Sequence, residues 1–218
     1  MKKQFTVMLF VALAFTACNT TPKGDNATTA DTQAVAQEGN NQYHTDTTSV
    51  VKFVGNGVGK NHPGKFKVKE GAITVTDNKV TAGSFVIDIA SLSLDEPAEM
   101  IQTKLKGHLL SPDFFDAEKF PTAKFEITKV VDYTSNGTDK SVVEGANALI
   151  SGNLTLKDQT KNVTFPAAVT VTDNNITAKA NFNIDRTSWG MNYNSDKSLK
   201  DKFISPDVNI ALELSASK

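Results

Sequence analysis

The feature that most constrains the fold is a strict alternation of apolar and polar residues, which recurs along the chain from Tyr43 onward. In the segment 176–184, for example, apolar residues occupy every second position and polar residues stand between them. This period is typical of β-strands with one dry face and one wet face. Antiparallel sheets tolerate such faces, whereas parallel sheets are covered on both sides. The alternation therefore predicts an all-β domain of antiparallel strands.

The alternating segments are separated by turn signals and by one helical pattern. They lie at 51–53, 65–69, 84–89, 124–127, 163–171, 176–184 and 208–214. Asp77-Asn78 and Asp173-Asn174 predict hairpin turns, because Asn and Asp adopt positive φ at low cost. Ile101, Leu105 and Leu109 recur every four residues after Pro97, which predicts one short amphipathic helix.

The number and length of the strands favour a closed barrel. So many alternating segments in one domain favour an antiparallel barrel with the helix lying over it, although a two-sheet sandwich stays open. The segment 79–90 alone would extend about 40 Å, and a small barrel of about eight strands holds side chains or one slender ligand. Long strands with an apolar inner face predict a deep, narrow tunnel that suits a chain-like apolar ligand.

The N-terminus predicts export and lipidation. Two lysines precede an apolar run, residues 5–15, which is shorter than the roughly 20 residues needed to span a bilayer. The run therefore reads as a signal peptide, residues 1–17. Thr16 and Ala17 stand before Cys18, as in the lipobox of bacterial lipoproteins, so Cys18 is the expected lipidation site. An ordinary signal peptide with a chance cysteine is the alternative.

Residues 18–42 are expected to be the lipidated cysteine and a disordered tether. The stretch 19–42 contains no aromatic residue, Leu, Ile or Met, so it cannot bury enough apolar area to offset its ordering entropy. The domain, residues 43–218, would then be held by its acyl chains on the periplasmic side of the bacterial envelope. Asn19 gives no clear retention signal, and we favour the outer membrane over the inner.

Composition excludes several classes of function. The 23 Lys+Arg against 24 Asp+Glu give a net charge of −1, so no basic excess points to a nucleic-acid partner. One cysteine excludes a disulfide framework and an all-Cys zinc site. His44, His62 and His108 lack the spacing of a metal site. We therefore expect no metal, no cofactor and no catalytic residue.

Two polar clusters leave alternatives open. Asp113 and Asp116, with His62, could serve an envelope hydrolase through acid–base chemistry. The other interpretation is a tight turn after the helix, in which the intervening Phe pair enters the core. Arg186, beside Asp185 and near Trp189, could orient a polar head group. A structural corner explains the same residues equally well.

An ordered series of short motifs resembles one known family. The series is His62-Pro63-Gly64, Phe85-Val86-Ile87-Asp88, LLSPDFFD at 109–116, Phe120-Pro121, GNLTLKDQTK at 152–161, Phe165-Pro166, DRTSWG at 185–190 and DKFI at 201–204. In this order the motifs resemble the YceI-like family of polyisoprenoid-binding proteins over about residues 43–216. The resemblance implies an extended, eight-stranded, lipocalin-like antiparallel barrel without catalytic residues. It also implies an isoprenoid ligand, with a polyprenyl or quinone-type tail, in the bacterial envelope.

These arguments give three hypotheses for function. The first is binding, storage or transport of an isoprenoid lipid; the others are the envelope hydrolase and a scaffold with a filled barrel. The expected lumen residues are Phe53, Phe66, Phe85, Ile87, Phe125, Phe165, Val169, Phe182 and Trp189. His62 and Arg186 are the candidates for the polar head group. The membrane is the second expected partner, through acylated Cys18, and the oligomeric state stays open.

Replacement of Cys18 tests the anchor. Cys18→Ala should leave the domain folded but release it from the membrane fraction, because the acyl chains, rather than a basic patch, hold it there. Fractionation of cells expressing the wild type and the variant measures the release. A variant that still sediments with membranes in high salt would refute the anchor.

Overall fold

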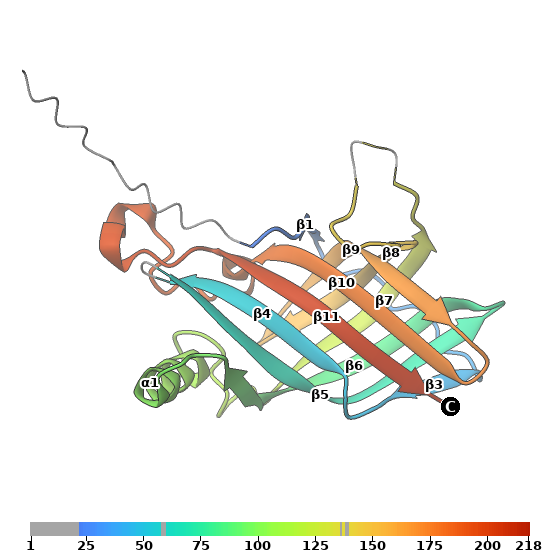
Figure 1. Ribbon diagram of the computed structural model, residues 1–218, viewed down its shortest axis with the longest axis horizontal. Coiled ribbons are helices and arrows are strands. Elements are labelled where there is room, and N and C mark those ends of the chain that lie inside the picture. Colours follow the sequence, from blue (N-terminus) through green and yellow to red (C-terminus); the bar gives the residue numbers. More distant parts are fainter. Residues whose placement is uncertain (1–21, 58–59, 136, 138–139) are drawn as a thin grey trace, which may run out of the picture.

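The structure of the protein, a computed structural model, describes residues 22–57, 60–135, 137 and 140–218. The predicted signal peptide and Cys18 lie outside the described residues. Figure 1 shows one elongated barrel whose strands cross its long axis obliquely, with a helix at one end. Within the described ranges, no helix is both long and apolar enough to cross a membrane.

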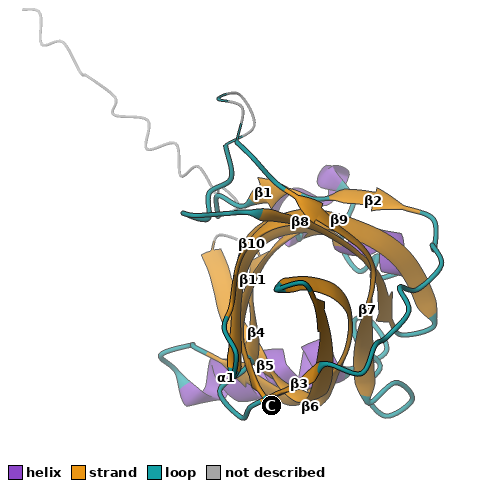
Figure 2. Ribbon diagram, turned by 90° about the vertical axis from the view of Figure 1, so that its right-hand side faces the viewer, coloured by secondary structure: helices purple, strands orange, loops and turns teal. Residues whose placement is uncertain are grey.

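The barrel consists of eight antiparallel strands, one of which is broken in two. Its members are β3 (Gln42–Thr45) with β4 (Val50–Gly57), β5 (Lys60–Thr76), β6 (Lys79–Leu94), β7 (Thr122–Asp132), β8 (Ala148–Leu156), β9 (Gln159–Val171), β10 (Asn175–Asp185) and β11 (Asp207–Ser217). Each strand from β5 to β11 pairs with the next, and β3 and β4 both bridge β11 to β5. The ladder therefore closes, as Figure 2 shows in the view along the barrel, and the predicted all-β antiparallel barrel is confirmed.

Both predicted hairpin turns are present at the residues that predicted them. Asp77 and Asn78 join β5 to β6 with φ of 49° and 59°, the left-handed geometry of a two-residue hairpin. Asp173 and Asn174 join β9 to β10 without positive φ; there the main-chain N–H of Thr172 donates to Asn175 over 2.8 Å. Both turns lie at the end of the barrel opposite the helix (Figure 1).

The predicted helix is α1 (Glu99–Leu110), and it lies over one end of the barrel. Pro97 stands two residues before it rather than in its first turn. Ile101, Leu105 and Leu109 are all half-buried, and of the three only Leu105 and Leu109 border the interior cavity. Two short 3-10 helices, η1 (Arg186–Trp189) and η2 (Lys197–Lys202), follow β10 at the same end.

The N-terminal segment differs from the disordered tether that its composition predicts. Within residues 22–42, β1 (Asp25–Asn26) pairs with β10 and β2 (Thr28–Ala30) pairs with β9. The direct ladder between β9 and β10 ends at the pair Ala167–Ala180, so this segment occupies the place where the two strands diverge. Main-chain pairing orders it, and main-chain pairing requires no apolar side chains.

A buried carboxamide ties the same segment to the wall of the barrel. The main-chain N–H of Gln33 donates to Oδ1 of Asn153 over 3.1 Å, and Nδ2 of Asn153 donates to the carbonyl of Gln33 over 2.7 Å. Asn162 also donates to Asn153 Oδ1 over 3.0 Å. Because Asn153 is only 2% exposed, water does not compete for these hydrogen bonds, and they stabilise the attached segment more than exposed bonds would.

Asn153→Ala should release the N-terminal segment. The substitution leaves the main chain of Gln33 without its partner, so we expect the free energy of unfolding to fall by about 1–3 kcal/mol and proteases to cut within residues 22–36 more readily. Denaturant unfolding and limited proteolysis measure these effects. The matched control is Asn147→Ala, which removes a carboxamide bonded to the main chain of Val169; equal cleavage of the two variants would contradict the assignment.

Candidate functional site

An apolar cavity of about 460 Å³ runs along the inside of the barrel. It extends from Ile73 and Val80, near the β5–β6 turn, to His62 and His108 at the end covered by α1. Its volume falls within the roughly 300–1,000 Å³ usual for small-molecule sites. The barrel is therefore hollow, which argues against a scaffold with a filled interior.

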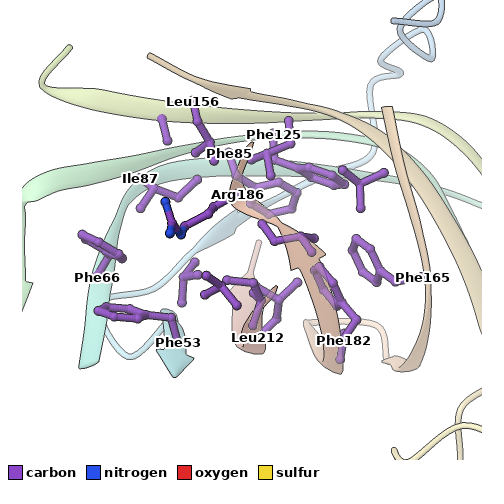
Figure 3. Close-up of a pocket in the computed structure, with 18 of the residues that line it drawn as sticks. Phe53, Phe66, Phe85, Ile87, Phe125, Leu156, Phe165, Phe182, Arg186 and Leu212 are labelled. Atoms are coloured by element: carbon purple, nitrogen blue, oxygen red, sulfur yellow. The ribbon is translucent and has the colours of Figure 1, made fainter. Parts of the chain in front are cut away.

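Eight of the nine expected lumen residues border the cavity. They are Phe53, Phe66, Phe85, Ile87, Phe125, Phe165, Val169 and Phe182, and Figure 3 shows several of them projecting inward from different strands. Their placement follows from the alternation, because side chains two positions apart share one face of a strand. That they bind a ligand stays a prediction.

The aromatic rings form two groups along the cavity. Nearer α1, the Phe53 and Phe66 rings stack with centroids 5.3 Å apart, and Phe115 meets Phe66 edge-on at 5.2 Å. Toward the other end, Phe165 and Phe182 stack at 4.0 Å with their planes 9° apart. These two occupy the positions where the β9–β10 ladder has already opened, so ring contact continues the strand pairing there.

Trp189 does not border the cavity, and this part of the expectation was wrong. Its side chain is fully buried, and its Nε1 donates to the carbonyl of Leu154 over 2.9 Å. The residue belongs to η1, where the two-residue period of a strand no longer applies. The indole instead packs in the core between η1 and the barrel wall.

Arg186 borders the cavity, but main-chain carbonyls occupy its donors. Nε donates to Ser205 over 3.1 Å, Nη2 donates to Tyr193 and Ile204 over 2.9 Å each, and Nη1 donates to Met191. Burial lowers the pKa of Arg186, and the nearby charge of Asp185 opposes that change, but a guanidinium stays charged. These contacts favour the structural corner, because Arg186 ties residues 191–205 to the end of β10.

His62 belongs to a second polar cluster at the α1 end. Its Nδ1 lies 2.6 Å from Oε1 of Glu96, and Nζ of Lys60 lies 2.9 Å from Oε2 of the same carboxylate. The Glu96 side chain is 3% exposed and that of His62 is 18% exposed. Hydrogen bonds from Lys60 and then from His62 hold the pKa of Glu96 below its usual value of 4.5.

Sequence reasoning missed Glu96. It stands in the connection between β6 and α1, outside every alternating segment, and its partners are 34 and 36 positions away in the sequence. No local signal identifies such a residue. Its partner His62 was identified, because it begins the motif His62-Pro63-Gly64 on which the family resemblance rests.

The residues of the hydrolase hypothesis do not come together. Asp113 Oδ2 pairs with Nε2 of His108 over 3.0 Å, and Asp116 occupies a turn with φ of 49°. Neither aspartate borders the cavity, while His62 pairs with Glu96. Among the described residues, no group of three or more His, Cys, Asp or Glu side chains has the arrangement of a metal site.

The connection after α1 adds apolar lining that the sequence assigned only to the core. Phe114 and Phe115 border the cavity, which agrees with the interpretation of this stretch as a tight turn whose Phe pair points inward. Leu105 and Leu109 of α1 border it too, and their apolar stripe was the available signal. The helix therefore contributes to the wall of the site.

A family model and curated relatives match the chain. The model for the YceI-like domain matches residues 43–216. UPF0312 proteins of Vibrio cholerae serotype O1 are 32% identical over 104 residues, and one of Vibrio vulnificus is 31% identical over the same length. Each match covers 48% of this chain and 48% of the relative, so the chain spans about half the length of the curated relatives it matches.

Solved structures share the fold at low identity. BcnA of Burkholderia cenocepacia matches with a TM-score of 0.60 and 21% identity, over 79% of this chain and 100% of that one. A polyisoprenoid binding domain from Saccharophagus degradans, implicated in plant cell wall breakdown, gives 0.58 and 14% over 84% and 99%. A YCEI protein of Campylobacter jejuni gives 0.50 and 18% over 69% and 82%.

Glu96→Gln tests the buried ion cluster through pH. A group whose pKa is lowered in the folded state stabilises that state above its unfolded pKa and loses the effect as pH falls through the folded pKa. The wild type should therefore exceed the variant by about 1–3 kcal/mol at neutral pH, and this gap should close below pH 4.5. Urea denaturation at a series of pH values measures the gap.

Asp113→Asn is the matched control for that experiment. It also neutralises a carboxylate paired with a histidine, but the Asp113 side chain is 51% exposed, and exposed pairs contribute little. We expect an effect below about 1 kcal/mol at every pH. A gap for Glu96→Gln that persisted in acid would show that its effect does not come from the charge.

Proposed function

Because the chain belongs to the YceI-like domain family, we propose that its barrel binds an isoprenoid lipid and holds the hydrocarbon tail in the cavity. The observation that carries the proposal is the apolar cavity. Phe, Ile, Leu, Val and Ala side chains dominate its lining, and they come from α1 and from every barrel strand except the short β3. Removing a hydrocarbon chain from water contributes about 0.8 kcal/mol for each buried CH₂. A solved relative of the same fold is a polyisoprenoid binding domain, which supports this ligand class.

The shape of the site favours a flexible chain over a compact ligand. The cavity follows the long axis of the barrel, with Phe53 and Phe66 toward one end and Phe165 and Phe182 toward the other (Figure 3). An isoprenoid tail is branched, unsaturated and extended, so it can contact both groups of rings at once. Polyprenyl tails and quinone-type tails share this chemistry.

The proposed role is binding, storage or transport, without catalysis. The polar residues at the α1 end have partners that hold them in place: Glu96 holds His62, Asp113 holds His108, and main-chain carbonyls hold Arg186. Such a site can retain and orient a lipid. The residues that a hydrolase would use lie in separate clusters.

The proposed location is the bacterial cell envelope. The short apolar run at residues 5–15 and the cysteine that follows two small residues support export and acylation at Cys18. An acylated chain would lie on the periplasmic side of a membrane, and we favour the outer one. The isoprenoid lipid and the membrane are then the two partners of the protein.

Phe165→Ala tests the cavity as the lipid site. The Phe165 ring is 2% exposed and stacks on Phe182, so its loss removes contact with the tail and widens the cavity. Lipid retention should weaken or shift toward bulkier tails. Delipidated protein should lose less than the roughly 3–5 kcal/mol that Phe→Ala costs in a packed core, because the ring already borders space.

Leu92→Ala is the matched control for Phe165→Ala. Leu92 is 1% exposed, belongs to the core and does not border the cavity. Its truncation should cost about 2–5 kcal/mol and leave lipid retention unchanged. Native mass spectrometry gives the retained lipid and denaturant unfolding gives the stability. A large stability loss for Phe165→Ala with unchanged retention would refute the assignment.

A further inference from the structure

His62 presents an imidazole edge to open space at the α1 end of the cavity. It lies on the inward row of β5 with Phe66 and borders the cavity. Across the ladder it pairs with Gly55, where an added Cβ would meet no atom within 4 Å. At Gly57 an added Cβ would lie 2.9 Å from Nε2 and Cδ2 of His62, so the ring covers that glycine. The two glycines thus leave room for the imidazole and for a small group beside it.

Glu96 determines which nitrogen of His62 carries the proton. A carboxylate can only accept hydrogen bonds, so Nδ1, 2.6 Å from Oε1, is the protonated nitrogen of the neutral ring. Nε2 is then an acceptor. Within the described part of the chain, Nε2 of His62 makes no hydrogen bond that would occupy its lone pair. A ligand group placed there satisfies it by donating a hydrogen bond.

Among the described residues, the cationic side chains nearest His62 at the α1 end already have partners. Lys60 pairs with Glu96, and Arg186 donates to four main-chain carbonyls. His108, the other imidazole at this end, pairs with Asp113. Lys179 borders the cavity in the half of β10 nearer the Asp173–Asn174 turn. Among the described residues that border the cavity at the α1 end, none offers an unpaired lysine or arginine, and the carboxylates of Glu96 and Asp113 lie nearby. This arrangement is unfavourable for a phosphate.

We propose that Nε2 of His62 is the head-group contact and that it accepts a hydrogen bond from the hydroxyl of an uncharged isoprenoid alcohol. This inference rests on the proposed function, because it concerns the head of a lipid whose tail lies in the cavity. An alcohol supplies the donor that Nε2 requires. A phosphate or pyrophosphate brings negative charge toward the buried carboxylate of Glu96, and no described residue bordering this end of the cavity offers it an unpaired lysine or arginine.

Competition among three lipids tests the head-group specificity. Delipidated full-length protein is offered geranylgeraniol, geranylgeranyl monophosphate and the hydrocarbon of the same chain length, and native mass spectrometry gives their relative affinities. The wild type should bind the alcohol at least about tenfold more tightly than the phosphate. His62→Ala should lower the alcohol's affinity relative to the hydrocarbon's by about three- to tenfold, the loss of one hydrogen bond.

Two further variants make the result specific to this nitrogen. His44→Ala removes an exposed imidazole on β3 that does not border the cavity, and it should leave the alcohol-to-hydrocarbon ratio unchanged. Gly55→Val fills the space beside His62 without touching its ion pair, and it should lower that ratio, because a hydrocarbon has no head to place there. This variant keeps the test valid if His62→Ala fails to fold.

The outcomes distinguish failure of the proposed lipid-binding function from failure of the proposed head-group contact. If the wild type binds none of the three lipids, the proposed function falls, and the head-group contact falls with it. If it binds them but prefers the phosphate, the tail site stands and the alcohol specificity is refuted. An unchanged alcohol-to-hydrocarbon ratio in both His62→Ala and Gly55→Val would likewise refute the role of His62.

Discussion

Closure of the antiparallel ladder is the constraint on which the rest of the structure depends. Every strand of the barrel has neighbours on both sides because β3 and β4 together join β11 to β5. Main-chain groups are satisfied around the ring, so the interior needs no polar atoms to receive them. Side chains alone then determine what the inside holds. In this chain they leave an apolar space, because large rings and small residues such as Ala167 and Ala180 share the inner face.

The sequence predicts the environment of a side chain wherever that environment depends on alternation along a strand. Phe53, Phe66 and Phe165 were placed correctly because a period of two determines which face each side chain occupies. Trp189 was misplaced because the strand ends at Asp185 and a 3-10 helix follows. Such an error is expected wherever regular structure stops, since parity carries no information beyond the last strand residue.

Contacts between distant segments explain the remaining differences. Glu96 meets partners from the β4–β5 hairpin, and the N-terminal segment meets Asn153 on β8, more than a hundred positions away. Composition describes what a segment can bury by itself, not what another segment offers to it. The buried polar groups follow one rule nonetheless: Glu96, Arg186 and Asn153 each have several partners close by, as buried polar groups require.

The attached N-terminal segment alters the geometry of an anchored protein. From Gly24 the chain follows the barrel wall beside β10, so only six Cα–Cα steps separate that wall from Cys18. They span at most about 22 Å when fully extended. This reach is much shorter than that of the predicted tether, which would extend to residue 42. A barrel acylated at Cys18 would remain in the headgroup layer or just above it, unable to cross the periplasm.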